Sequence, residues 1–200
     1  MRLCAKFNRK SGLSLLEAMI VLAATALLLG NIAMVQTASG DAHESSIFSS
    51  ALEDQAETTM DRIALAIMST SIEDLDDVLS APSFVSSIDY EVVTDVVDGQ
   101  PIVGTPERIE FDMPRGRVIW KREPDSDDEL EVTWAKYVPG LLEGEEPNGI
   151  DDNGNGMEDE SGLAFNLNIK QITVRLTLRR VDSNGIEYTK TRSRRVTCRN

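Results

Sequence analysis

An apolar run from Ala18 to Val35 constrains the fold of this chain more than any other stretch of its sequence. Thr25 and Asn31 are its polar interruptions. A helix of about 18 apolar residues reaches most of the way across a hydrocarbon layer of ~30 Å. We therefore expect a transmembrane helix within residues 13–35.

A lone carboxylate, Glu17, stands at the start of this run. The leader before it, residues 1–12, carries four basic side chains and no acidic one, which predicts that it stays on the cytoplasmic side of the membrane. An ionised carboxylate at a membrane edge costs roughly 2.5 kcal/mol or more when it lacks a partner. Glu17 is therefore expected to pair with a cation.

The combination of Gly12, Leu13 and Glu17 resembles the processing site of type IV pilins and type II secretion pseudopilins. The resemblance implies that a prepilin peptidase cuts after Gly12, that Leu13 becomes the first mature residue and is methylated, and that Glu17 becomes the fifth. Members of this family often have Phe at the position of Leu13, so the chain departs from the pattern there without a change of register.

A cut after Gly12 creates a new amine at Leu13, and such amines have a pKa near ~7.7. This amine can pair with Glu17 of a neighbouring subunit and so set the axial stagger between subunits. The alternative is an ordinary secretory signal with Ala38-Ser39-Gly40 as its cleavage site. That alternative would release a soluble extracytoplasmic module.

Residues 13–80 are expected to form a long N-terminal helix followed by a short one. Because Pro82 is the first proline, the long helix can run unbroken to about Thr70, and Ser71 then caps a short helix that ends near Leu79. Apolar residues of the second half recur every three or four positions, which predicts one buried face. They are Phe48, Leu52, Ala56, Met60, Ile63 and Ile67.

Beyond Pro82 the hydrophobic period changes to two, which is typical of strands. Residues 81–200 are therefore predicted to form an extracytoplasmic β-rich head. The predicted fold class is α+β, and the family resemblance implies a pilin-like arrangement of a long helix and an antiparallel sheet. The polar last strand is expected at the sheet edge. Strands are expected within residues 88–96, 108–113, 118–120, 130–134, 172–179 and 186–196.

The loop at residues 148–162 combines acidic, Asn and Gly residues at the spacing of a calcium loop. It resembles the short calcium loops of thrombospondin type 3 repeats and dockerins, but Gly162 stands where an EF-hand loop has Glu. The alternative is an acidic turn that binds no ion. The candidate Ca²⁺ ligands are Asp151, Asn153, Asn155, the Met157 carbonyl, Asp159 and Glu160.

Charge is distributed unevenly along this chain of net charge -14. Residues 41–168 hold 31 acidic and seven basic side chains, whereas residues 169–200 hold two acidic and nine basic ones. This asymmetry predicts attraction within one subunit or between stacked subunits, with basic side chains on solvated strand faces as the alternative. Nucleic-acid binding is not expected from so acidic a chain. A further acidic cluster at residues 125–129 is expected to be a solvated loop, with a second ion site as the alternative.

A non-enzymatic function is expected, because the sequence has one histidine, His43, and no nucleophile or phosphate-loop motif. The chain looks most like a J-type minor pseudopilin of type II secretion or a W-type minor pilin. That resemblance implies a single-pass protein of the inner membrane with its head in the periplasm, assembling at a filament or filament tip. Its partners would be other pilins, the prepilin peptidase and an assembly platform, and the machine could serve secretion, adhesion, motility or DNA uptake.

Overall fold

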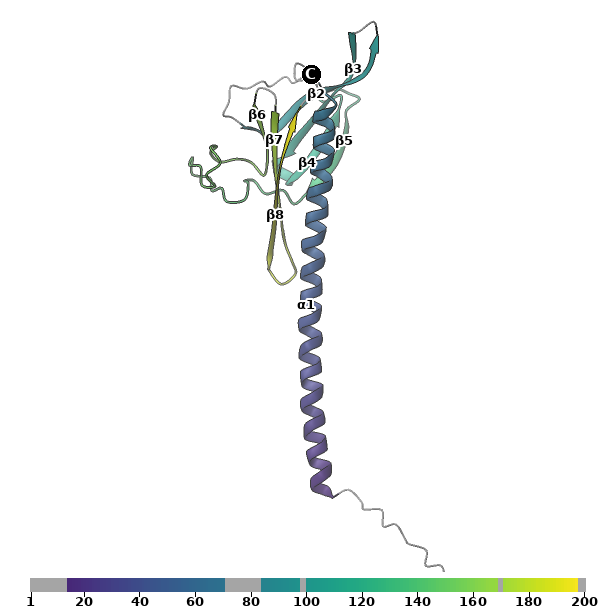
Figure 1. Ribbon diagram of the computed structural model, residues 1–200, viewed down its shortest axis with the longest axis vertical. Coiled ribbons are helices and arrows are strands. Elements are labelled where there is room, and N and C mark those ends of the chain that lie inside the picture. The colour runs from purple at the N-terminus through teal and green to yellow at the C-terminus, as the bar shows by residue number, and fades with distance from the viewer. Residues whose placement is uncertain (1–13, 71–83, 98–99, 169–170, 198–200) are drawn as a thin grey trace, which may run out of the picture. The chain divides into compact units, whose positions relative to one another are not determined.

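The computed structural model describes residues 14–70, 84–97, 100–168 and 171–197. It confirms the α+β prediction of one long N-terminal helix followed by antiparallel strands (Figure 1). The chain divides into two compact units, one up to Ser46 and one from Ile47. The elements in order are α1 (Leu15–Met68), β1 (Phe84–Val85), β2 (Ser87–Val97), β3 (Gln100–Asp112), the 3-10 helix η2 (Met113–Arg115), β4 (Arg117–Arg122), β5 (Leu130–Lys136), β6 (Leu163–Asn168), β7 (Gln171–Val181) and β8 (Glu187–Thr197).

Helix α1 begins where its sequence supplies a cap. The Ser14 hydroxyl accepts a hydrogen bond from the Glu17 backbone N–H at 3.3 Å, and Glu17 places a negative charge in the first turn. Both features stabilise a helix N-terminus, the first by satisfying a free N–H and the second by its charge. At the other end, the Ser69 hydroxyl bonds to the Ala66 carbonyl at 2.7 Å.

The second half of α1 buries the face that its periodicity predicts. Leu52, Ala56, Met60, Ile63 and Ile67 are all buried. They join the hydrophobic core formed with the strands. The sixth predicted position, Phe48, is half-buried and stacks on Tyr188, with ring centroids 6.0 Å apart.

The strands form two four-stranded antiparallel sheets where the sequence predicts one. Their strand orders are β1-β6-β7-β8 and β2-β3-β4-β5. Ser86 alone separates β1 from β2, so the chain passes from one sheet to the other at that residue. Side chains from both sheets, including Ile109 of β3 and Leu176 of β7, contribute to the single core that contains α1 residues.

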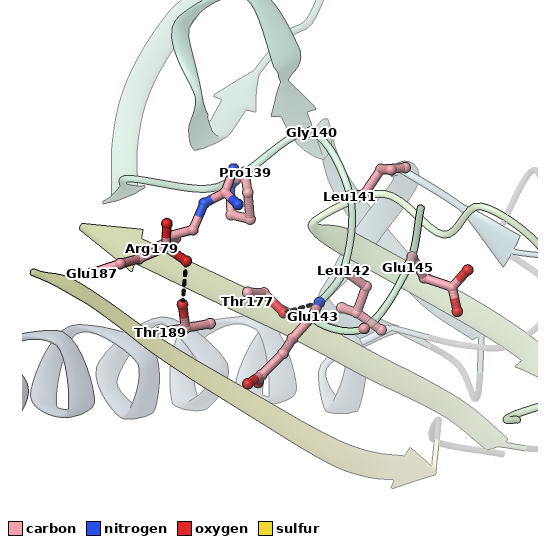
Figure 2. A pocket seen from close by; sticks show the side chains of 11 residues that line it. Pro139, Gly140, Leu141, Leu142, Glu143, Glu145, Thr177, Arg179, Glu187 and Thr189 are labelled. Carbon is pink, nitrogen blue, oxygen red and sulfur yellow. Dashed lines mark hydrogen bonds between the residues drawn. The ribbon is translucent and has the colours of Figure 1, made fainter. Parts of the chain in front are cut away.

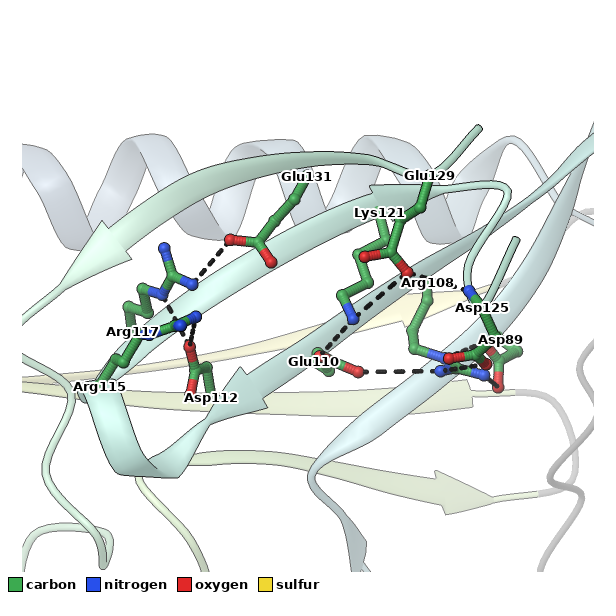
Figure 3. A network of polar contacts seen from close by, with 10 residues as sticks. All are labelled: Asp89, Arg108, Glu110, Asp112, Arg115, Arg117, Lys121, Asp125, Glu129 and Glu131. Atoms are coloured by element: carbon green, nitrogen blue, oxygen red, sulfur yellow. Dashed lines mark hydrogen bonds and ion pairs between the residues drawn. The ribbon is translucent and has the colours of Figure 1, made fainter. Parts of the chain in front are cut away.

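Charged side chains cover the face of β2-β3-β4-β5 that lies opposite the core (Figure 3). Arg108 Nε lies 2.6 Å from an Asp89 oxygen, and Lys121 Nζ lies 3.3 Å from Glu110 and 3.5 Å from Glu129. Asp89 lies directly opposite Arg108 across the β2–β3 pair, an arrangement that places opposite charges together on a half-exposed surface. Arg108 and Lys121 lie opposite each other across the β3–β4 pair, and each has carboxylate partners.

Strand β8 lies at a sheet edge, as its polar sequence predicts. Its basic side chains form five ion pairs with acidic side chains of α1, which confirms attraction within one subunit. The pairs are Lys190–Glu53, Arg192–Glu53, Arg192–Glu57, Arg194–Glu57 and Arg194–Asp61. The hydrogen bond to Asp61 raises the pKa of Arg194 above its ordinary value.

Candidate functional site

Glu17 lies in the first turn of a helix whose neighbouring side chains are apolar and exposed. Leu15 and Leu16 before it are 83% and 71% exposed, and Ile20 after it is 61% exposed. No ion pair joins Glu17 to any residue that the structure describes. The predicted processing residues Gly12 and Leu13 lie outside the described residues, as does the short helix expected at residues 71–79.

Among the described residues, α1 is the one helix long and apolar enough to cross a membrane. Its apolar stretch buries nothing within the protein. Large apolar side chains face outward around this stretch, from Leu15 through Leu27, Leu28 and Leu29 to Val35. A helix that is apolar all round fits a hydrocarbon environment or the interior of a larger assembly.

The candidate calcium loop is preceded by residues 139–145, here called its neck, which lie beside the β1-β6-β7-β8 sheet. The Leu142 N–H bonds to the Glu160 carbonyl at 2.8 Å, and the Glu143 N–H bonds to the Thr177 hydroxyl of β7 at 3.1 Å. Thr177 is 1% exposed, so this outward face of β7 is covered here by the loop. The alternation of apolar and polar residues in β7 predicts that Thr177 points away from the core. It does not predict that Thr177 is buried, because the segment that covers it lies 34 residues away in the sequence.

Asp151 organises the turn at the tip of this loop. Its carboxylate accepts hydrogen bonds from the backbone N–H groups of Gly154 at 2.7 Å, Asn155 at 3.1 Å and Gly156 at 2.7 Å. Gly154 and Gly156 have φ values of 73° and 92°, which a side chain would strain. The D-x-N-x-N-G spacing thus produces a turn closed by its own first carboxylate.

Asn153, Asn155 and Glu160 converge inside the loop. The side-chain amide of each Asn donates to the same oxygen of Glu160, at 3.4 Å from Asn153 and closer from Asn155. Glu160 is fully buried, and its other oxygen accepts from Arg175 at 2.8 Å. Because rotation of an amide exchanges its nitrogen and oxygen, these three side chains can offer three oxygens to one cation.

Asp159 and Met157 have other contacts. The Asp159 carboxylate accepts from the backbone N–H groups of Asn148 at 3.1 Å and Gly149 at 3.0 Å. The Met157 side chain is buried, and its sulfur accepts from the Asn166 amide at 2.9 Å. The six predicted ligands are therefore distributed over one loop, with Asn153, Asn155 and Glu160 gathered at a single point.

Glu145 belongs to the same loop, although the spacing of the motif does not indicate it. Its two carboxylate oxygens accept from the Asn153 N–H at 3.3 Å and the Asp159 N–H at 3.2 Å, and it is 8% exposed. Within the described residues, no three His, Cys, Asp or Glu side chains form a metal-binding group. The Ca²⁺ ligand set would therefore depend on the two Asn side chains, on waters and on backbone oxygens as well as on carboxylates.

No family model, curated protein or solved structure matches the chain. The assignment of a function therefore depends on the residues of this chain and their contacts.

A pocket of about 450 Å³ lies between the neck of the loop and strands β7 and β8 (Figure 2). Polar groups line it, including Glu143, Thr177 and Arg179. The Thr189 hydroxyl bonds to Glu187 at 3.3 Å on one side of the pocket. The pocket lining combines the carboxylates of Glu143, Glu145 and Glu187 with the hydroxyls of Thr177 and Thr189.

Proposed function

We propose that this chain is a membrane-anchored, pilin-like subunit that acts by assembly and not by catalysis. The observation that carries the proposal is helix α1 itself. It combines an exposed apolar first part, a carboxylate at Glu17 in its first turn, and a second part whose one apolar face packs on a β head. This division fits a helix that is anchored in a membrane or filament and carries a folded domain.

In this proposal a prepilin peptidase removes residues 1–12, and Glu17 pairs with the N-terminal amine of a neighbouring subunit. The subunit resides in the inner membrane with its head in the periplasm and enters a pseudopilus or type IV pilus, at the shaft or tip. Among the functions such an assembly can have, we favour type II secretion, because of the resemblance to J-type minor pseudopilins. The absence of an ion pair between Glu17 and the other described residues supports an intermolecular partner.

The second candidate is a soluble module released by cleavage after Gly40. Gly40 lies within α1, with helical residues on both sides. A peptidase acting there would need to unwind the helix locally. This observation favours the membrane-anchored proposal over the released module.

We also propose that the loop at residues 148–162 binds Ca²⁺ in a structural role. Support comes from the closed turn at Asp151 and from the convergence of Asn153, Asn155 and the buried Glu160. A hard cation prefers such oxygen ligands. Arg175 already neutralises one oxygen of Glu160, which reduces the charge available to the ion and favours weak binding.

Replacement of Glu17 tests the assembly proposal. We expect Glu17→Ala to insert in the membrane at least as well as the wild type, because the change removes a charge from an apolar segment. Co-purification of this variant with a tagged wild-type copy should fall several-fold, because the partner amine loses its carboxylate.

Asp54→Ala is the matched control, since Asp54 is an exposed carboxylate of the same helix. It should co-purify as the wild type does. Equal recovery of the Glu17→Ala and Asp54→Ala variants would contradict the proposed role of Glu17.

A further inference from the structure

A basic pocket of about 570 Å³ lies where β4 begins and β5 ends. Four cationic side chains line it, from Arg115, Arg117, Lys136 and Arg179. None of its lining residues is acidic. We call these four residues the basic pocket.

The basic pocket keeps positive charge that the rest of the described chain does not neutralise. Arg117 is engaged by Asp112 at 2.8 Å and by Glu131 at 2.7 Å. Arg115 is 68% exposed, and its contact with Asp112 is 3.4 Å long. Lys136 and Arg179 form no ion pair with any described residue. Such a site is unusual in a chain of net charge -14, and it would attract carboxylates.

The walls of the basic pocket are held in place by backbone contacts. The Val138 N–H bonds to the Gly116 carbonyl at 3.0 Å. Gly116 has a φ of +58°, and a Cβ at this position would lie 3.0 Å from the Val138 carbonyl oxygen, so glycine is required for this close approach. The Arg180 guanidinium lies 4.9 Å from the centre of the Tyr137 ring, which holds a second wall. The walls of the pocket are therefore held by contacts within the chain itself.

The other end of the same hairpin carries the acidic loop, residues 123–129, which joins β4 to β5. Its conformation is fixed by its own hydrogen bonds. The Ser126 hydroxyl donates to the Glu123 carbonyl at 2.8 Å, and the Asp125 N–H donates to Glu129 at 2.9 Å. Glu123 and Asp125 have positive φ values of 52° and 65°. The loop thus presents its side chains from a defined backbone.

The acidic loop has carboxylates in excess of its local cations. Asp125 pairs with Arg108 at 3.0 Å, and Glu129 lies 3.5 Å from Lys121. Asp127 and Asp128 are exposed and form no ion pair with any described residue. Figure 3 shows Arg115 and Arg117 at one end of this face and Asp125 with Glu129 toward the other.

We propose that the acidic loop of one copy docks in the basic pocket of a second copy of this chain. The register of β4 and β5 runs from Arg117–Lys136 at the pocket to Arg122–Leu130 at the loop. Six strand residues separate the two by ~20 Å. Complementary surfaces at opposite ends of one hairpin make a head-to-tail contact, which repeats from copy to copy and does not close by two-fold symmetry.

Asp127 and Asp128 are the carboxylates that enter the pocket, and Lys136 and Arg179 are the cations that receive them. Guanidinium and carboxylate groups form two parallel hydrogen bonds when they meet in plane. Because the charges are exposed, salt weakens the contact strongly, with screening over about 8 Å at physiological ionic strength. The contact goes beyond the proposed function, since it requires neither processing of the leader nor the Glu17 pair.

Charge reversal in the full chain, purified in detergent, tests this contact by sedimentation. One variant reverses the pocket (Lys136→Glu with Arg179→Glu), and a second reverses the loop (Asp127→Lys with Asp128→Lys). Each should weaken self-association about tenfold or more, equivalent to ~1.4 kcal/mol. A third variant with all four changes exchanges the two signs and should associate as the wild type does.

Asp54→Lys with Glu158→Lys is the matched control for the loop reversal, because it makes the same change in net charge at exposed acids elsewhere. It should leave self-association unchanged. The proposal is overturned if the wild-type chain stays monomeric, if the loop reversal has no effect beyond that control, or if the four-change variant fails to regain association. If the basic pocket binds an anion other than the acidic loop, the pocket reversal would change self-association and the loop reversal would not.

Discussion

Glu160 and its neighbours illustrate how far single residues can be interpreted from sequence. The spacing of Asp151, Asn153 and Asn155 predicts a tight oxygen-rich turn, because each contact within it spans two to five residues. The burial of Glu160 and its pairing with Arg175 could not be predicted. Arg175 lies on a strand 15 residues away, and burial depends on how the loop packs against that strand.

Calcium should stabilise the full chain through this loop. An ion that binds the folded state alone raises the free energy of unfolding by ~2.7 kcal/mol at a hundredfold excess over its dissociation constant. We expect a higher melting temperature in millimolar Ca²⁺ than in chelator, and a much smaller effect of Mg²⁺, which prefers a tighter octahedron. Thermal unfolding of the chain in detergent measures both.

Asp151→Ala should abolish this calcium-dependent rise in melting temperature, since it removes both a ligand and the acceptor that closes the turn. Glu158→Ala is the matched control, because Glu158 is an exposed acid of the same loop. If the wild-type chain melts at the same temperature with and without Ca²⁺, the loop is an acidic turn that binds no ion, and the calcium proposal is contradicted.

At the scale of elements, the predictions succeed where the periodicity is long. The buried face of α1 from Leu52 to Ile67 and the strand that became β7 extend over several repeats, so their hydrophobic periods are unambiguous. Strands β1 and β6 were not predicted. Strand β1 has two residues, too few to give a periodic signal. Strand β6 does alternate, with Leu163, Phe165 and Leu167 buried, but its six residues follow a loop rich in turn residues and the signal was missed.

The ion pairs between β8 and α1 should contribute modestly to stability. Exposed pairs typically contribute 0.2–1 kcal/mol each, and these side chains are one-third to one-half exposed. We expect Arg192→Ala with Arg194→Ala to lower the free energy of unfolding by ~1 kcal/mol. Urea unfolding at low and high salt measures this loss, which should shrink at high salt.

Arg195→Ala provides the comparison for that experiment. Arg195 lies on the same strand, is exposed, and forms no ion pair with any described residue. Its removal should change stability little at either salt concentration. A loss for the double variant that is no larger than that of Arg195→Ala would mean that the pairs contribute nothing measurable.

For the whole molecule, the sequence predicts the order of the segments along the chain better than it predicts how the strands are arranged in sheets. The apolar run, the amphipathic continuation and the β-rich remainder are each properties of a long stretch, and the structure has all three. The split into two sheets depends on the break at Ser86 between β1 and β2, a local event that strand periodicity does not report. The basic pocket likewise combines β4, β5 and β7, and no segment of sequence contains it.

The central claim is that the chain is processed and anchored as a pilin-like subunit. Sequencing the N-terminus of the mature protein, isolated from membranes of cells that contain a prepilin peptidase, tests this claim most directly. The account predicts a mature chain that begins at Leu13 with a methylated amine, and a Gly12→Leu variant that keeps its leader. A mature chain that begins at Asp41 would contradict it.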